Sequence, residues 1–147
     1  MRVIVQRVLE ATVIINDKII NKIDRGYLLF VGLKKDDKQA DLEYCARKIA
    51  KLRIFSDDNN LMNLNIDKIH GKILSISQFT LYADTRKQNR PGFSKAMEYK
   101  FAKEMYLRFN DILRKTYKLD VFEGVFGESM KISSINDGPV TIIIDSE

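Results

Sequence analysis

Two short polar stretches contain the residue types that could do chemistry. The first is Ser77, Gln78, Phe79 and Thr80, at the end of an apolar run that predicts a strand over residues 72–82. In a strand, Gln78 and Thr80 would face one side, and Ser77 and Phe79 the other. The stretch is therefore either a strand with a polar solvent face or a site where hydroxyl groups and free backbone donors meet.

The second stretch, N-D-G-P-V-T, covers residues 136–141. Its composition predicts a turn between two strands, over residues 129–135 and 140–145.

The standard catalytic templates find little support. His70 is the single histidine and precedes a glycine in an expected turn, so we interpret it as an exposed turn residue rather than a general base. Cys45 falls on the apolar stripe of an expected helix, which favours a buried small hydrophobe over a nucleophile. No His and Cys cluster could bind zinc, and no glycine-rich phosphate loop follows a strand. We expect no cofactor and no metal.

The elements that must position these residues alternate between strand runs and two helices. Apolar residues recur at helical spacing over residues 36–52 and 94–115, and Ser94 is the expected N-cap of the second helix. The expected strands cover residues 2–9, 12–15, 19–23, 26–33, 53–55, 72–82, 119–123, 129–135 and 140–145. This order predicts an α+β or barrel-with-helices fold, not a repeated βαβ alternation.

Length and composition limit the class of protein. The 147 residues fit one domain, residues 1–147, and a content of 45% hydrophobic and 31% charged residues excludes a disordered chain. No apolar run is long enough for a signal peptide or a membrane span, and one cysteine allows no internal disulfide, so we expect a cytoplasmic protein with no membrane contact. The net charge of +5 is compatible with a polyanionic partner but does not require one.

Residues 77–81 and 136–141 together resemble two motifs, SQFTL and N-x-G-P-V-T, of the D-aminoacyl-tRNA deacylases. Supporting matches span the chain, at residues 6–8, 53–57, 62–65, 90–91 and 93–94. Both motifs occur in the right order in a chain of the right length, without a departure from either. The sequence therefore resembles the D-aminoacyl-tRNA deacylase (D-Tyr-tRNA deacylase) family over its whole length.

The resemblance implies an α+β fold with a β-barrel-like antiparallel or mixed sheet and two main helices. It also implies a homodimer with the active site at the subunit interface. One subunit would contribute the catalytic stretch, Ser77, Gln78, Phe79 and Thr80. The other would insert Gly138 and Pro139, joined by a cis peptide bond. Arg7 is implied as the residue that holds this insert, and we expect Met130 and Thr141 to line the pocket.

The implied partner is the aminoacylated 3′ end of tRNA, and the implied reaction hydrolyses its ester to a free D-amino acid and tRNA. A rigid backbone wall at Gly138 and Pro139 would accept the hydrogen on Cα of a D-amino acid and exclude the side chain of an L-amino acid. Glycine has no side chain to exclude, so we expect some activity on glycyl-tRNA.

Several alternatives remain open at the level of sequence. Thr80 is either a nucleophile or a positioning group for a water assisted by the terminal 2′-hydroxyl of the tRNA, and we favour the second. Phe79 either stacks near the terminal adenosine or packs in the core. Arg86, Lys87 and Arg90 either contact tRNA phosphates or form a solvated turn. The competing functions are a non-catalytic nucleic-acid-binding barrel and a purely structural dimer module.

Overall fold

A computed structural model describes residues 1–146, which form a six-stranded mixed sheet, a two-stranded ribbon and two α-helices. In chain order the elements are β1 (Arg2–Ile15), β2 (Lys18–Ile23), β3 (Gly26–Gly32), α1 (Gln39–Lys51), β4 (Phe55–Ser56), β5 (Met62–Leu64), the 3₁₀ turn η1 (Asp67–Ile69), β6 (Lys72–Ser77), the 3₁₀ turn η2 (Phe79–Tyr82), α2 (Tyr99–Lys115), β7 (Asp120–Glu123) and β8 (Lys131–Asp145).

The long strand β1 organises the sheet. One edge of β1 pairs antiparallel with β8 along its length, and the other edge pairs antiparallel first with β3 and then with β2. β3, β6 and β7 continue the sheet in parallel. β3 is buried along almost its whole length because it lies between two strands and is covered on both faces, which confirms the strand expected from its continuous apolar run.

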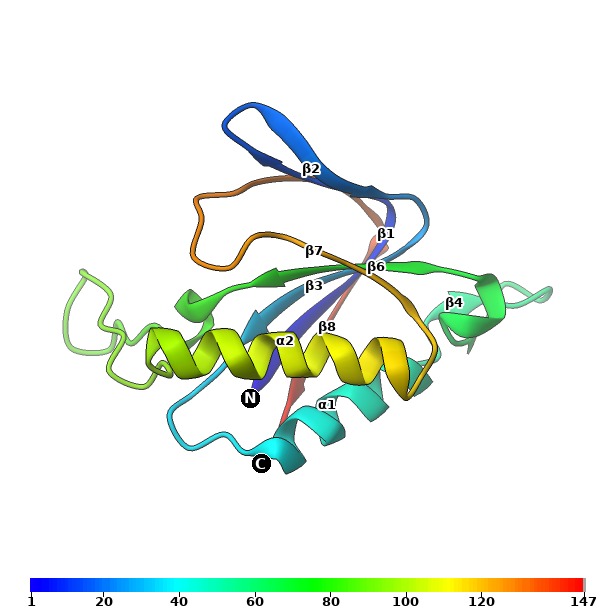
Figure 1. The fold of residues 1–147 in the computed structure, drawn as a ribbon. Helices are drawn as coiled ribbons and strands as arrows, with labels where there is room; N and C mark the ends of the chain where they lie inside the picture. Colours follow the sequence, from blue (N-terminus) through cyan, green and yellow to red (C-terminus); the bar gives the residue numbers. More distant parts are fainter. Residues whose placement is uncertain (147) are drawn as a thin grey trace.

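The two helices pack against each other on one face of the sheet (Figure 1). The expected apolar stripe of α1 is confirmed, since Leu42, Cys45, Ala46 and Ile49 are all buried. The main hydrophobic core lies between these helices and β1, β3 and β6. α1 begins at Gln39 rather than at residue 36, because the Asp37 carboxylate accepts a hydrogen bond from the Lys34 backbone N–H at 2.7 Å and so belongs to the preceding turn.

The sheet curls around a second, smaller core on its other face, formed by buried residues of β1, β2, β3 and β6. β2 lies against β6 and β7, and the Asn21 side-chain amide of β2 donates to the Glu123 carbonyl oxygen of β7 at 2.6 Å. The sheet is therefore nearly closed, as expected for a barrel-like α+β fold with two main helices. No helix within residues 1–146 has the length and apolar character of a membrane span.

Other expected boundaries were also wrong. β1 is one strand through residue 15, because Glu10 pairs with Lys22 at the surface and does not interrupt it. β8 is one strand of 15 residues with an internal bulge, not two strands and a turn. β6 ends at Ser77, and η2 follows it. α2 begins at Tyr99 after the N-cap Glu98, whose carboxylate accepts from the Lys100 N–H, so Ser94 is not the cap.

Candidate active site

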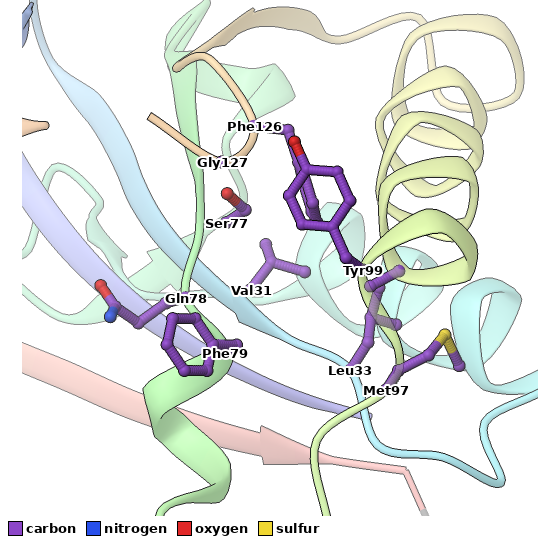
Figure 2. Close-up of a pocket in the computed structure, with 10 residues that line it drawn as sticks. Val31, Leu33, Ser77, Gln78, Phe79, Met97, Tyr99, Phe126 and Gly127 are labelled. Carbon is purple, nitrogen blue, oxygen red and sulfur yellow. The ribbon is translucent and has the colours of Figure 1, made fainter. Parts of the chain in front are cut away.

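An apolar pocket of about 330 Å³ opens at one edge of the sheet, where β3 and β6 end (Figure 2). Because β3 and β6 are parallel, they end at the same edge, and Val31 lies opposite Ser77 in the register. The Gln78 backbone N–H donates to the Val31 carbonyl oxygen at 2.8 Å and fixes the first residue after β6. The lining residues are Val31, Leu33, Ser77, Gln78, Phe79, Met97, Tyr99, Ala102, Phe126 and Gly127.

Two segments that the sequence analysis did not assign to a site close the pocket. Tyr99 stands on the first turn of α2 and meets the ring of Phe126 edge-on at 5.2 Å between centroids. Gly127 has a φ of +86°, and a Cβ added there would lie 2.4 Å from the Tyr99 hydroxyl oxygen. A signal was present for Tyr99, since it lies three residues before Ala102 and extends the apolar stripe of the second helix. The pairing with residues 126–127 depends on tertiary structure.

The stretch Ser77, Gln78, Phe79 and Thr80 departs from the expected strand geometry. Because η2 starts at Phe79, the residues no longer alternate between two faces, and Ser77, Gln78 and Phe79 all line the pocket. Phe79 lines the pocket and is 57% exposed, so it is not a core residue. The Gln78 amide points away from Tyr99 and Phe126 in Figure 2 and donates to the Thr80 hydroxyl oxygen.

The start of η2 leaves two hydrogen-bond donors free. Within residues 1–146, the backbone N–H groups of Phe79 and Thr80 donate to no protein acceptor, whereas the next amide, that of Leu81, bonds to the Gln78 carbonyl oxygen at 3.3 Å. The first N–H groups of a helical turn lack partners within the turn. They can therefore donate to a bound group, and Phe79 itself lines the pocket.

No conventional acid or base accompanies these donors. The side chains that line the pocket include no His, Cys, Asp, Glu, Lys or Arg. His70 is exposed at the end of η1, which confirms its interpretation as a turn residue. Cys45 is fully buried, and burial raises the pKa of its thiol to about 12, so it remains protonated as expected of a small core residue.

The second sequence stretch forms a bulge in β8. Gln6 pairs with Thr141 and Val8 pairs with Asn136, so the single residue Arg7 on β1 lies opposite residues 137–140 on β8. Gly138 and Pro139 are exposed in this bulge and joined by a cis peptide bond. The bulge explains why composition alone suggested a turn, although the strand continues on both sides.

Arg7 lies beneath the bulge and contacts its backbone. The side chain of Arg7 is largely buried, and its Nε lies 3.2 Å from the Asp137 carbonyl oxygen and 3.1 Å from a carboxylate oxygen of Asp137. Its Nη1 donates to the Ile54 carbonyl oxygen at 2.6 Å. A Cβ added to Gly138, whose φ is +124°, would lie 3.1 Å from Arg7 Nη2 and 2.7 Å from a Val140 methyl group. These contacts leave little freedom for the bulge to move.

Within one chain the two stretches are not brought together. Residues 136–141 do not line the apolar pocket. Thr141 is exposed on β8, where its hydroxyl oxygen accepts from the Asn136 amide at 3.0 Å. Met130 packs against the second core and does not line this pocket. The roles of Arg7, Met130, Thr141 and the bulge in a substrate site therefore stay predictions.

The basic loop after η2 is partly neutralised. The guanidinium of Arg86 is bidentate on the carboxylate of Asp84 and holds the pKa of that carboxyl well below its usual range. Lys87 and Arg90 are exposed and form no ion pair within the described residues 1–146. The positive charge available to a polyanion in this loop is therefore smaller than the sequence suggests.

Comparisons with known proteins match this chain to a family of deacylases. The family described as D-Tyr-tRNA(Tyr) deacylase matches residues 4–145. A D-aminoacyl-tRNA deacylase of Staphylococcus saprophyticus is 50% identical over 147 residues, which is all of this chain and 97% of the relative, and one of Staphylococcus haemolyticus is 51% identical over the same shares.

Two solved structures share the fold. One, of a protein named c-Myc DNA Unwinding Element Binding Protein, is 38% identical with a TM-score of 0.94 and covers 100% of this chain and 99% of its own. The other, described as a probable eukaryotic D-amino acid tRNA deacylase, is 17% identical with a TM-score of 0.85, over 99% of this chain and 98% of its own. The family match spans nearly all of the sequence, and the chain belongs to the D-Tyr-tRNA(Tyr) deacylase family.

Proposed function

We propose that the protein hydrolyses the ester bond between a D-amino acid and the 3′ end of tRNA, and releases the free D-amino acid and tRNA. Family membership and the relatives named D-aminoacyl-tRNA deacylase support the reaction. The observation that carries the proposal is an apolar pocket lined by Phe79, the first residue of a 3₁₀ turn whose first two backbone donors, Phe79 N–H and Thr80 N–H, have no protein acceptor within residues 1–146. Such a pocket, with few polar groups at fixed positions, is typical of small-molecule sites. The substrate implies a cytoplasmic enzyme.

Ester hydrolysis requires a water molecule that attacks the carbonyl carbon and hydrogen-bond donors that stabilise the negative charge on the carbonyl oxygen. Water attacks the ester carbonyl, and the N–H groups of Phe79 and Thr80 stabilise the oxyanion that forms. The bond to the ribose oxygen then breaks, and that oxygen takes a proton. Because no titratable acid or base other than Tyr99 lines the pocket, the neighbouring 2′-hydroxyl of the terminal ribose orients the water and relays the proton. Thr80 positions the substrate and forms no acyl intermediate.

Aromatic side chains form the binding site for the terminal nucleotide. The exposed ring of Phe79 meets Phe93 edge-on at 4.9 Å between centroids, and its free face stacks on the terminal adenine. Tyr99 and Phe126 form the opposite wall. Stacking of a base on an aromatic side chain contributes about 1–3 kcal/mol, which would hold the terminal nucleotide in place.

The bulge of β8 completes the site from a second copy of the chain. Within residues 1–146, β8 pairs with β1 alone, and its Ile135 and Ile143 are 51% and 60% exposed. A long edge strand with exposed apolar side chains is prone to association, and a two-fold dimer would cover it. In this homodimer Gly138 and Pro139 of each subunit enter the pocket of the other.

The backbone at Gly138 and Pro139 selects the D configuration. It lies beside Cα of the bound aminoacyl group, where it accepts a hydrogen and excludes a carbon. Gly138 presents no side chain, and Arg7 fixes the segment through the Asp137 carbonyl oxygen. Many D side chains are accepted because they point away from this wall, and glycyl-tRNA is hydrolysed to some degree because it has nothing to exclude.

A mixing experiment tests the proposed reaction and the shared site together. Phe79→Ala removes the pocket rim, and Gly138→Ala obstructs the wall, so each variant should be nearly inactive on D-Tyr-tRNA. Heterodimers formed by refolding both variants together hold one intact site, so activity should return to about a quarter of the wild-type value. The matched control, Gly138→Ala refolded with Gly138→Leu, should stay inactive. A mixture that regains nothing contradicts the shared site, and a wild-type protein without turnover contradicts the reaction.

A binding module without turnover is the second candidate. The observation that favours it is the name of one 38% identical solved structure, which describes a protein that binds a DNA element. It predicts that this protein binds tRNA or DNA and leaves D-aminoacyl esters intact. Turnover of D-Tyr-tRNA by the wild-type protein therefore separates the two functions.

A further inference from the structure

A second hollow of about 660 Å³, here called the basic cleft, lies beside the apolar pocket. Its cationic lining residues are Arg2, Lys34, Lys35, Arg86 and Lys95, and they outnumber its two carboxylates, Asp36 and Asp84. A concave surface with excess positive charge concentrates a polyanion near it.

Residues that line the basic cleft are near neighbours in the sequence of residues that line the apolar pocket. Leu33 lines the pocket, and its neighbour Lys34 lines the cleft. Phe79 lines the pocket, and Leu81 in the same 3₁₀ turn lines the cleft. Just before α2, Lys95 lines the cleft and Met97 lines the pocket. Three separate segments therefore pass from the pocket lining to the cleft lining within two residues, so the two hollows lie next to each other.

Three of the cations are free to bind a ligand. Arg2 is paired with Asp145 at 2.7 Å, and Arg86 is paired with Asp84. Lys34, Lys35 and Lys95, in contrast, form no ion pair within the described part of the chain. An unpaired ammonium group binds a phosphate at a lower free-energy cost than a paired one, because it has no existing ion pair to break.

The backbones that carry these lysines are fixed to each other. The Lys35 N–H donates to the Lys95 carbonyl oxygen at 3.1 Å, and the Met97 N–H donates to the Leu33 carbonyl oxygen at 3.0 Å. The Lys34 N–H is held by the Asp37 carboxylate at 2.7 Å. The three ammonium groups thus extend from one rigid platform rather than from independent loops.

We propose that the basic cleft binds the phosphodiester groups of the single-stranded tRNA 3′ end, next to the terminal nucleotide that occupies the apolar pocket, and that Lys34, Lys35 and Lys95 make these contacts. The proposal rests on the proposed function for the identity of the RNA. It assigns the phosphate contacts to these lysines and not to Arg86, because Arg86 is already held by Asp84.

A second basic surface on α1 supplies a matched control. Lys48 and Lys51 are exposed on α1 and line neither the pocket nor the basic cleft. The Lys48 ammonium lies 5.4 Å from the Tyr44 ring centroid, in a cation–π contact. Removal of these two lysines changes the net charge as much as removal of Lys34 and Lys95. Any difference between the two double variants therefore reports position and not total charge.

The test is the affinity of full-length uncharged tRNA for the protein as a function of salt, which does not depend on turnover. Lys34→Ala combined with Lys95→Ala should weaken binding roughly tenfold and lower the slope of log affinity against log salt by about 1.4, since a single-stranded phosphate contact contributes about 0.7. Lys48→Ala combined with Lys51→Ala should stay within about twofold of wild type. Lys34→Arg combined with Lys95→Arg should restore binding, which excludes misfolding as the cause.

Equal affinity and slope for the cleft variant and the wild type would overturn the proposal, as would a wild type that binds no tRNA. A second readout uses D-tyrosyl-adenosine, which has no phosphate. The cleft variant should hydrolyse it at the wild-type rate while its KM for D-Tyr-tRNA rises. Wild-type protein that binds tRNA through the cleft but hydrolyses neither ester would contradict the proposed function and leave the cleft assignment standing.

Discussion

A Cβ placed on Gly138 would lie 3.1 Å from Nη2 of Arg7, a side chain that is largely buried and whose neighbouring Nη1 donates to the Ile54 carbonyl oxygen. The arginine therefore cannot move aside without leaving a buried acceptor unpaired. This relationship joins β1, β8 and the segment before β4 around one exposed backbone bulge. It provides a structural reason for glycine at this position that is independent of any substrate.

The first prediction concerns this bulge. Gly138→Ala should lower kcat/KM for D-Tyr-tRNA by about 100-fold, because the new methyl group meets both Arg7 and Val140 and the φ of +124° disfavours any residue with a Cβ. Gly92→Ala is the matched control, since the nearest atom to its Cβ is 3.5 Å away. Steady-state kinetics on both variants measure the effect. Equal activity of the two would show that the bulge has no part in catalysis.

The second prediction concerns the pocket wall. Gly127→Ala should push the Tyr99 ring into the pocket, because the added carbon would lie 2.4 Å from the hydroxyl oxygen and the φ of +86° is unfavourable for alanine. KM should rise more than kcat falls, since binding space is lost and the backbone donors remain. Gly127→Ala combined with Tyr99→Ala should recover part of the affinity. An unchanged KM for Gly127→Ala alone would show that Tyr99 does not contribute to the substrate-binding site.

The third prediction separates the two mechanisms open to Thr80. Its hydroxyl accepts from the Gln78 amide, and no base lines the pocket, so Thr80→Ala should keep most of the wild-type kcat. A nucleophilic role predicts a loss of about 1,000-fold or more. Mass spectrometry of the wild-type enzyme, quenched during turnover, provides the second readout. An added aminoacyl mass on the peptide containing Thr80 would refute water as the attacking group.

The fourth prediction concerns Cys45 and alkaline pH. Burial raises the pKa of its thiol to about 12, above the ordinary value of 9.0 that applies in the unfolded chain. A raised pKa contributes stability that is fully present below pH 9 and is lost as the pH rises towards 12, because only the unfolded state releases the proton there. The free energy of unfolding should fall in that window by up to about 1.4 kcal/mol per pH unit from this group.

Denaturant titrations of wild type and Cys45→Ala measure this slope. In Cys45→Ala the free energy of unfolding should fall less steeply with pH, by the contribution of about one proton. The variant should keep the contribution from Tyr106, because burial also raises the pKa of that phenol to about 12. Identical slopes for the two proteins would show that Cys45 is not the group responsible.

Local periodicity predicted the parts of the fold that depend on one element at a time. The stripe of α1 and the buried run of β3 were correct because each residue's burial follows from helical or strand spacing. The break expected in β8 was wrong, because the bulge is held by Arg7, which lies about 130 residues away in the chain. No local pattern contains that contact.

The candidate site also has a part that local sequence could predict and a part that depends on tertiary contacts. Residues 77–80 could be singled out because polar residues end an apolar strand, and three of them line the pocket. Their arrangement could not be predicted, because the change from strand to 3₁₀ turn after Ser77 depends on the Gln78 N–H bonding to Val31 of β3. Tyr99 and Gly127 come together through packing of α2 against the loop before β8. Spacing in the sequence carries no information on this contact.

The central claim is hydrolysis of a D-aminoacyl ester with chiral selection, and one measurement tests it most directly. Purified protein is incubated with D-Tyr-tRNA and, separately, with L-Tyr-tRNA, in the presence of a chelator, and release of tyrosine is followed. We predict rapid loss of the D-ester, with the L-ester stable at the rate of the uncatalysed control. Stability of both esters while tRNA remains bound, or loss of both at similar rates, would contradict the account.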